Sequence, residues 1–166
     1  VEPAEPGVMK HKPRGRKSSF FDGGVMEAIL YQGAFQTLLV LGVYGFALMF
    51  PEHAGNDHMM HEDALTMAYV TLGLIQLVHA YNVKSVYQSI FKVGLFKNRL
   101  FNYSIPIAFV MLMSTVVIPG FNKFFHVSHL SVTQWLVVVV GSLLMVVLVE
   151  IVKAVQRALG QDENAI

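Results

Sequence analysis

Residues 133–152 read TQWLVVVVGSLLMVVLVEIV and contain a single charged side chain, Glu150. A helix rises about 1.5 Å per residue, so this stretch is long enough to cross the roughly 30 Å hydrocarbon core of a bilayer. Trp135 stands near its start, where an amphipathic ring is favoured at the membrane–water interface. The stretch therefore predicts a membrane-spanning helix.

Three earlier stretches share this apolar character, at residues 24–50, 64–81 and 100–118. None alternates as the strands of a membrane barrel do, with about ten residues per strand. The composition agrees, because 54% of the residues are hydrophobic and 14% are charged, against about 45–50% and about 25% in soluble domains. We predict an all-α integral membrane protein, with four transmembrane helices within residues 24–158 and a tail at 159–166.

The Lys and Arg side chains predict how these helices are oriented. Eleven of the twelve lie on one side of the membrane if the four helices alternate in direction. Segments rich in Lys and Arg stay on the cytoplasmic side. We therefore expect a multi-pass protein of the cell (plasma) membrane with both termini in the cytoplasm. The eleven residues are Lys10, Lys12, Arg14, Arg16, Lys17, Lys84, Lys92, Lys97, Arg99, Lys153 and Arg157.

The second predicted helix carries polar side chains that deserve an explanation, because polar groups deep in a bilayer are costly. Gln76 and His79 share a helix face with Tyr69 and with Gly73, whose missing side chain predicts close approach of a neighbouring helix. Gln76 either lends its amide oxygen to an ion path or makes an interhelical hydrogen bond. His79 is either a proton or polar relay, since its charge changes near neutral pH, or a neutral side chain bonded to a neighbour.

The connection at residues 51–63 is rich in histidine and carboxylate side chains. Such side chains bind divalent metals, but this segment has no recognised ligand spacing. A solvated acidic loop that weakly concentrates cations is the interpretation we favour over a metal site. The side chains are Glu52, His53, Asp57, His58, His61, Glu62 and Asp63.

Lys12, Arg14 and Arg16 belong to a short basic run ahead of the first predicted helix. Basic side chains near a membrane are attracted to anionic lipids by about 1 kcal/mol each. The run either contacts membrane lipids or docks on an acidic cytoplasmic domain, and the lipid interpretation needs no partner.

Several catalytic features are absent from the sequence. It has no cysteine, no Gly-rich phosphate loop and no Asp-Lys-Thr-Gly segment. We therefore name no catalytic residue, no nucleotide site and no resident cofactor in these residues. The net charge of +1 gives no reason to expect a nucleic-acid partner.

Short motifs along nearly the whole chain resemble a known family, the bacterial P-type cation-transporting ATPases of the calcium-pump type. The resemblance is to their C-terminal transmembrane domain, helices seven to ten, with residues 1–23 similar to the cytoplasmic loop after the sixth helix. The motifs are Glu2-Pro3, Met9, Lys12-Pro13-Arg14, Thr66-Met67-Ala68, Asn98 and Thr133-Gln134-Trp135.

The resemblance implies active export of cations, with Ca²⁺ as the transported ion and Mg-ATP used by the full-length protein. It implies as partners the remaining pump helices and the phosphorylation domain, which makes docking at least as good an interpretation as lipid contact for Lys12, Arg14 and Arg16. It also implies that Gln76 stands where some calcium pumps have a Glu that binds one of two ions. An amide removes one negative charge, which predicts a pump with a single calcium site.

Two other functions remain open from the residues alone. A stand-alone four-helix transporter would need a charged substrate-binding residue in mid-helix, and only Gln76 and His79 come near that. A non-enzymatic membrane scaffold is the third candidate. Manganese and sodium also remain open as transported ions.

Overall fold

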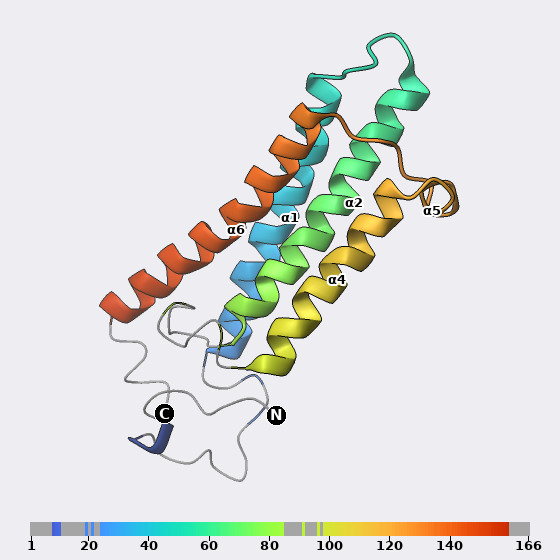
Figure 1. Ribbon diagram of the computed structural model, residues 1–166. Helices are drawn as coiled ribbons and strands as arrows, with labels where there is room; N and C mark the ends of the chain where they lie inside the picture. Colours follow the sequence, from blue (N-terminus) through green and yellow to red (C-terminus); the bar gives the residue numbers. More distant parts are fainter. Residues whose placement is uncertain are drawn as a thin grey trace.

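The computed structural model describes residues 8–10, 19, 21, 24–84, 91, 96 and 98–159. Within these residues all regular secondary structure is helical (Figure 1). In chain order the elements are η1 (Val8–Lys10), α1 (Val25–Met49), α2 (Asp57–Asn82), α4 (Arg99–Val117), α5 (Phe121–Phe124) and α6 (Val132–Ala158).

Four of these helices, α1, α2, α4 and α6, are long and apolar enough to cross a membrane. They alternate in direction, so that the start of α1, the end of α2, the start of α4 and the end of α6 lie at the same end of the molecule (Figure 1). The predicted all-α protein with four spanning helices is confirmed. Which end faces the cytoplasm stays a prediction.

α2 begins earlier than the sequence pattern predicts. Residues 57–63, expected in a loop, form its first two turns. Asn56 caps the helix, because its side-chain oxygen accepts a hydrogen bond from the backbone N–H of Met59 at 3.3 Å. Asp57 lies in the first turn, where the helix dipole favours negative charge. Local capping therefore extends the helix beyond its apolar part.

α6 runs past its predicted end at Val152 and stops at Ala158. Its start is fixed by a capping box, in which the side chains of Ser131 and Gln134 each bond the other residue's backbone N–H. Lys153 and Gln156, in the added turns, are both buried. These polar residues were expected outside the apolar span, and the packing of α6 against α2 explains why the helix continues through them.

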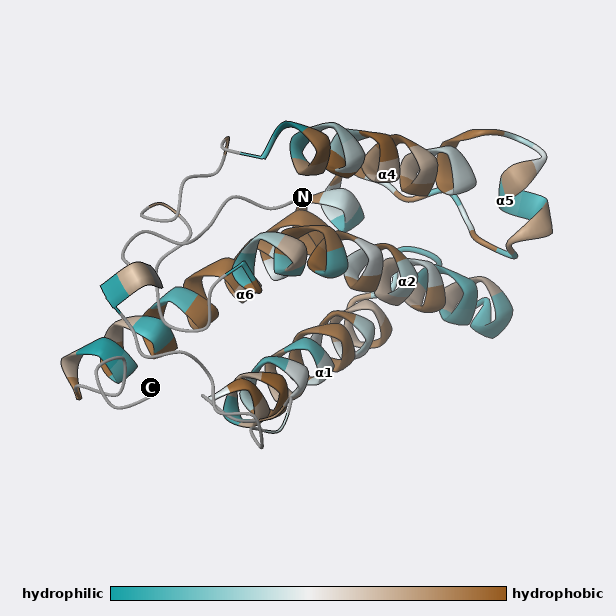
Figure 2. Ribbon diagram, turned by 90° about the horizontal axis from the view of Figure 1, so that it is seen from below, coloured by the Kyte–Doolittle hydropathy of each residue, from teal (hydrophilic) through white to brown (hydrophobic). Residues whose placement is uncertain are grey.

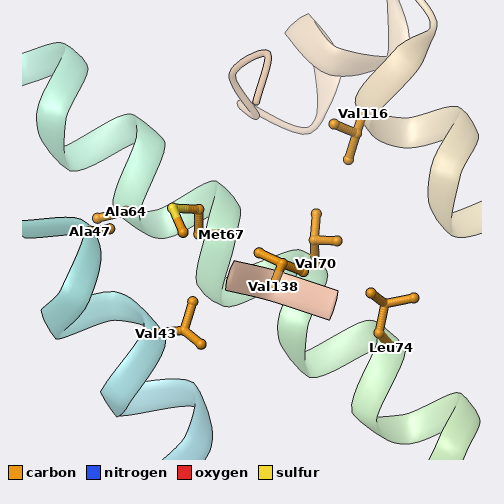
Figure 3. Close-up of a cluster of buried hydrophobic side chains, with 8 residues drawn as sticks. All are labelled: Val43, Ala47, Ala64, Met67, Val70, Leu74, Val116 and Val138. Carbon is orange, nitrogen blue, oxygen red and sulfur yellow. The ribbon is translucent and has the colours of Figure 1, made fainter. Parts of the chain in front are cut away.

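α2 lies at the centre of the bundle and contacts α1, α4 and α6. One core cluster joins residues of all four long helices (Figure 3). A second, smaller cluster joins α2 to α6 toward the other end. The first cluster contains Val43, Ala47, Ala64, Met67, Val70, Leu74, Val116 and Val138, and the second contains Ile75, Met145 and Val149.

α4 stands apart from the other long helices and packs beside α2, away from α1 (Figure 2). Val116 is its one buried residue. Gly73 makes the contact with α2 close, since a Cβ at that position would lie 2.7 Å from the side chain of Leu112. The close approach predicted from Gly73 is thus made by α4.

Candidate functional site

Gln76 lies on α2 and is bonded to Gln36 on α1. The Nε2 of Gln76 donates to the Oε1 of Gln36 at 3.2 Å. Gln76 is exposed in this chain, and Gln36 is half-buried. The bond is an interhelical contact of the kind expected if Gln76 holds the bundle together. It also leaves the Oε1 of Gln76 outside any hydrogen bond within the described part of the chain.

Two other residues of the predicted face of α2, Tyr69 and Gly73, turn toward α4. The hydroxyl of Tyr69 lies 3.2 Å from that of Thr115 on α4, and Gly73 packs against Leu112. Gln76, by contrast, reaches α1. The structure therefore divides the residues that the spacing had placed together: Tyr69 and Gly73 contact α4, and Gln76 pairs with an amide of α1.

Helical spacing places Gln36 where it can meet Gln76. Gln32 lies four residues earlier on the same face of α1 and is 3% exposed. The Nε2 of Gln32 donates to the hydroxyl of Tyr31 at 3.0 Å. α1 thus presents two amides toward the bundle, and neither is among the site residues predicted from the sequence. Their spacing of four residues is the signal that could have found them.

His79 lies one turn beyond Gln76 and is half-buried. Its Nδ1 is buried and has no hydrogen-bond partner among the described residues. The bonded neighbour expected for a purely structural histidine is thus not found at this nitrogen. The relay role of His79 stays a prediction.

A buried polar cluster lies where α2 ends against α6. Lys153 is fully buried, and its Nζ donates to the backbone carbonyl of Asn82 at 2.6 Å. That carbonyl belongs to the last turn of α2, where intrahelical donors run out and the dipole favours a cation. Within the part of the chain that the structure describes, the side-chain amide of Asn82 and the Oε1 of Gln156 are buried without a hydrogen-bond partner.

Lys153 entered the predictions as one of the basic side chains that set the membrane orientation, and neither Asn82 nor Gln156 was among the predicted site residues. His79 and Asn82 are three residues apart on α2, as are Lys153 and Gln156 on α6. Such pairs share a helix face. These two pairs, each three residues apart, were the sequence pattern that could have indicated the cluster. Recognising the cluster also required knowing that α2 and α6 face each other.

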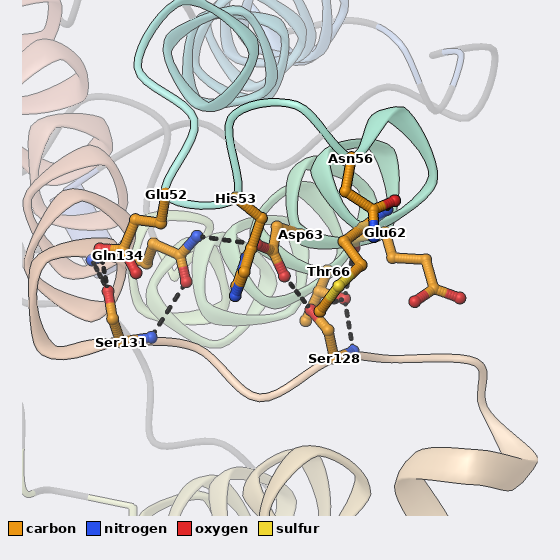
Figure 4. Close-up of polar contacts among 10 residues, drawn as sticks. Glu52, His53, Asn56, Glu62, Asp63, Thr66, Ser128, Ser131 and Gln134 are labelled. Carbon is orange, nitrogen blue, oxygen red and sulfur yellow. Dashed lines mark hydrogen bonds and ion pairs between the residues drawn. The ribbon is translucent and has the colours of Figure 1, made fainter.

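The other end of α2 carries a fully bonded network around Asp63, which is 5% exposed (Figure 4). The Oδ1 of Asp63 accepts from the hydroxyl of Ser128 at 2.7 Å. Its Oδ2 lies 2.8 Å from the Nδ1 of His53 and 3.4 Å from the Nε2 of Gln134, which donates to it. Both carboxylate oxygens of Asp63 thus have hydrogen-bond partners, which offsets the cost of burying the group.

Two further contacts attach neighbouring segments to this network (Figure 4). The hydroxyl of Thr66 accepts from the backbone N–H of Ser128 at 2.9 Å. The hydroxyl of Ser131, which caps α6, donates to the carboxylate of Glu52. The loop after α1, the start of α2 and the segment before α6 are therefore bonded to one another.

This network corrects the prediction of a solvated acidic loop at Asp63, whereas Glu52, His53, Asp57, His58 and His61 are exposed as expected. Asp63 is buried and bonded, because the segment that precedes α6 folds over it. The structure gives no support to the alternative of a metal site in this segment. The described residues contain no group of three or more His, Asp or Glu side chains placed to hold an ion. Lys12, Arg14 and Arg16 lie outside the described residues.

Comparison with known proteins gives the family of this chain. The family model of the cation transporting ATPase C-terminus matches residues 1–155. Calcium-transporting ATPase 1 of Bacillus cereus is 34% identical and aligns with 95% of this chain. A calcium-transporting ATPase of Listeria monocytogenes is 30% identical over 95% of the chain, and calcium-transporting ATPase 1 of Saccharomyces cerevisiae is 24% identical over 99%.

These relatives are much longer than the matched region. The alignments cover 19% of the Bacillus protein and 17% of each of the other two. The chain therefore spans less than a fifth of the length of the relatives that it matches.

Proposed function

The chain belongs to the family of cation transporting ATPase C-terminal domains, and from that premise we propose that it forms the last four membrane helices of an ATP-driven calcium export pump. The observation that carries this proposal is the alignment of nearly the whole chain with calcium-transporting ATPases at 30% identity or more. Four helices long enough to span a membrane agree with this multi-pass arrangement. A stand-alone transporter and a scaffold subunit have no comparable support.

The remaining pump helices are the proposed partners of the surface that carries Gln36 and Gln76. An exposed amide in the middle of a spanning helix is costly against lipid tails. Gln76 is exposed in this chain although it lies well inside α2. Its cost is removed if helices from the rest of the pump cover this surface.

Gln76 is the residue that we propose at the ion path. Ca²⁺ takes six to eight oxygen ligands, and an amide oxygen is a suitable neutral one. Because Gln76 adds no negative charge, the other helices must supply the carboxylates. We therefore propose one calcium ion per transport cycle, with Mg-ATP used by the phosphorylation domain and no catalytic residue in these four helices. His79 is proposed as a polar relay beside this path.

The residues ahead of α1 are proposed to couple the phosphorylation domain to the membrane helices. We propose that both termini are cytoplasmic in the cell membrane, as the Lys and Arg distribution predicts. Lys12, Arg14 and Arg16 would then face the phosphorylation domain, with lipid headgroups as their alternative contact. Replacing Arg14 and Arg16 together by Ala should slow phosphoenzyme turnover in the full pump. Unchanged turnover would favour lipid contact.

The proposed function is tested with the full-length pump that contains this chain, in inside-out membrane vesicles. ATP should drive Ca²⁺ uptake with one ion transported per ATP hydrolysed. Gln76→Met, which keeps the side-chain length but removes the amide, should raise the Ca²⁺ concentration needed for half-maximal uptake. Two ions per ATP would contradict the single site, and uptake without ATP dependence would contradict the pump.

A further inference from the structure

We propose that the end of the bundle where α2 stops and α4 begins binds an anionic phospholipid. The positive charges of Lys84 and Arg99 hold its headgroup, and an acyl chain lies along the outer face of α4. Neither Gln76 nor any other residue of the proposed ion path takes part. The lipid covers the side of α4 that the other described helices leave open.

Aromatic rings hold the ammonium group of Lys84 beside the first turn of α4. Its Nζ lies 4.4 Å from the ring centre of Phe101 and 5.4 Å from that of Tyr81. The two rings pack edge to face at 4.9 Å, and the hydroxyl of Tyr81 donates to the Oδ1 of Asn102 at 3.3 Å. An ammonium group above a ring keeps its charge and has further N–H donors for an anion. The positive charge is thus fixed where α2 meets α4.

Arg99 adds a second positive charge in the same turn. It is the first residue of α4, and its side chain is exposed. Neither Lys84 nor Arg99 forms an ion pair within the part of the chain that the structure describes. Residues 64–149, which include both, contain no Asp or Glu. An anion from outside these helices can therefore complement both charges.

An apolar stripe on the outer face of α4 continues from this charged end. Its members repeat at helical spacing, and each is more than half exposed. The first ten residues of the stripe rise about 15 Å, which is the hydrocarbon thickness of one leaflet in a core of about 30 Å. A positive end followed by an apolar stripe of this length matches an anionic headgroup and its acyl chain. The members are Leu100, Tyr103, Ile107 and Val110.

An acidic surface of the phosphorylation domain is the competing partner for these two charges. Such a surface would leave Leu100 and Tyr103, which directly follow Arg99 and are 71% and 69% exposed, without apolar contacts. Both belong to a helix that is long and apolar enough to cross a membrane. A lipid complements the charges and the apolar side chains together, so the combination favours a lipid.

The test measures which phospholipid lies beside the start of α4 in the full-length pump that contains this chain. Tyr103→Trp places a fluorescent ring on the outer face, and the pump without this substitution supplies the background of its other tryptophans. The pump is reconstituted in vesicles of phosphatidylcholine and phosphatidylglycerol. One lipid or the other carries bromine on its acyl chains, which quenches tryptophan fluorescence. Comparing the two quenching curves gives the preference for the anionic lipid at this position.

A headgroup site predicts a preference for phosphatidylglycerol that depends on both charges. Lys84→Gln and Arg99→Gln, each in the Tyr103→Trp pump, should lower the preference about five-fold, which corresponds to about 1 kcal/mol for each basic side chain. Arg99→Lys keeps the charge and should retain the preference. Lys123→Gln is the matched control, since Lys123 is exposed on α5, beyond the other end of α4. It should leave the preference unchanged.

Three results would overturn the lipid site. Equal quenching by the two brominated lipids would mean that the start of α4 does not select an anionic lipid. An equal fall in Lys123→Gln would mean that any basic side chain near the bilayer has the same effect. Unchanged quenching in the variant with both Lys84→Gln and Arg99→Gln, together with slower phosphoenzyme turnover, would assign the two charges to the phosphorylation domain.

The readout separates the lipid site from the proposed function, because quenching requires neither Ca²⁺ nor ATP. Loss of the lipid preference would leave the calcium site as proposed, and failure of Ca²⁺ uptake would leave the lipid site standing. If Lys84→Gln gives little folded pump, the comparison of Arg99→Gln with Arg99→Lys decides by the same criteria.

Discussion

Asp63 near the start of α2 and Asn82 at its end are both buried against neighbouring segments, but their side chains are bonded in different ways. Asp63 is a charged group with a hydrogen-bond partner at each oxygen. Asn82 is a neutral group whose side-chain amide has no hydrogen-bond partner in the described ranges, although its backbone carbonyl binds the ammonium of Lys153. Hydrogen bonds thus offset the larger cost of burying the charged Asp63, whereas the smaller cost of burying the neutral amide of Asn82 is not offset.

This difference shows that α2 is fixed in two ways. At the Asp63 end, side chains supplied by three separate segments satisfy one another, so the described residues complete the network themselves. At the Asn82 end, Lys153 binds the last turn of α2, and polar atoms of Asn82, Gln156 and His79 have no hydrogen-bond partner among the residues that the structure describes. The first end should therefore be sensitive to the loss of any partner, and the second should tolerate apolar replacements.

The largest effect is expected from Asp63→Ala. It leaves the hydroxyl of Ser128 and the amide of Gln134 without their acceptor, which should destabilise the pump by about 3 kcal/mol. Thermal unfolding of the purified full-length pump in detergent measures the effect. Asp63→Asn, which keeps the shape and one oxygen, is the control and should lose less. An unchanged unfolding temperature in Asp63→Ala would mean that the network does not stabilise the fold.

A smaller loss is expected from Lys153→Met. The substitution removes the donor to the carbonyl of Asn82 but also removes the cost of burying an ammonium group, and Met retains the apolar packing of the stem. We expect a loss of about 1–2 kcal/mol by the same assay. A loss larger than that of Asp63→Ala would reverse the comparison between the two ends.

Ser131→Ala should cost about 1 kcal/mol, because it removes the cap of α6 and the bond to Glu52. Ser104→Ala is a matched control, since Ser104 is exposed and its hydroxyl donates only to the carbonyl of Phe101 in its own helix. Equal unfolding temperatures for the two variants would show that the cap of α6 contributes nothing measurable.

The smallest effect is expected from Asn82→Leu. A buried amide without partners gains nothing from its polar atoms, so an apolar side chain of similar volume should change stability by less than about 0.5 kcal/mol or increase it. Asn122→Leu, at a buried amide that does contact His129 at 3.1 Å, provides the contrast and should be destabilising. A marked loss in Asn82→Leu would reveal a partner for that amide.

The four spanning helices could be predicted because length and hydropathy are local properties, as in residues 133–152. The burial of single polar residues could not be predicted, because it depends on partners far away in the sequence. Asp63 looked solvated because its neighbours in sequence are charged, and its partner Ser128 lies 65 positions away. Lys153 looked like a cytoplasmic anchor until α6 was placed against the end of α2.

The candidate site was predicted in part. Gln76 stood out because an amide is unusual within an apolar helix. Its partner Gln36 did not, since choosing between Gln32 and Gln36 depends on how α1 is rotated relative to α2. Rotation is decided by packing around Val43 and Ala47, which no local pattern in the sequence reveals.

The bonds around Asp63 also have a mechanical consequence. They join the loop after α1, the start of α2 and the segment before α6 at one end of the bundle. Toward the opposite ends, α2 and α6 are joined by the contact of Lys153 with the carbonyl of Asn82 and by the apolar cluster of Ile75, Met145 and Val149. A force applied at that end would tilt α2 and α6 about the bonded Asp63 end. The backbone would then move most near Asn82 and Lys153 and least near Asp63.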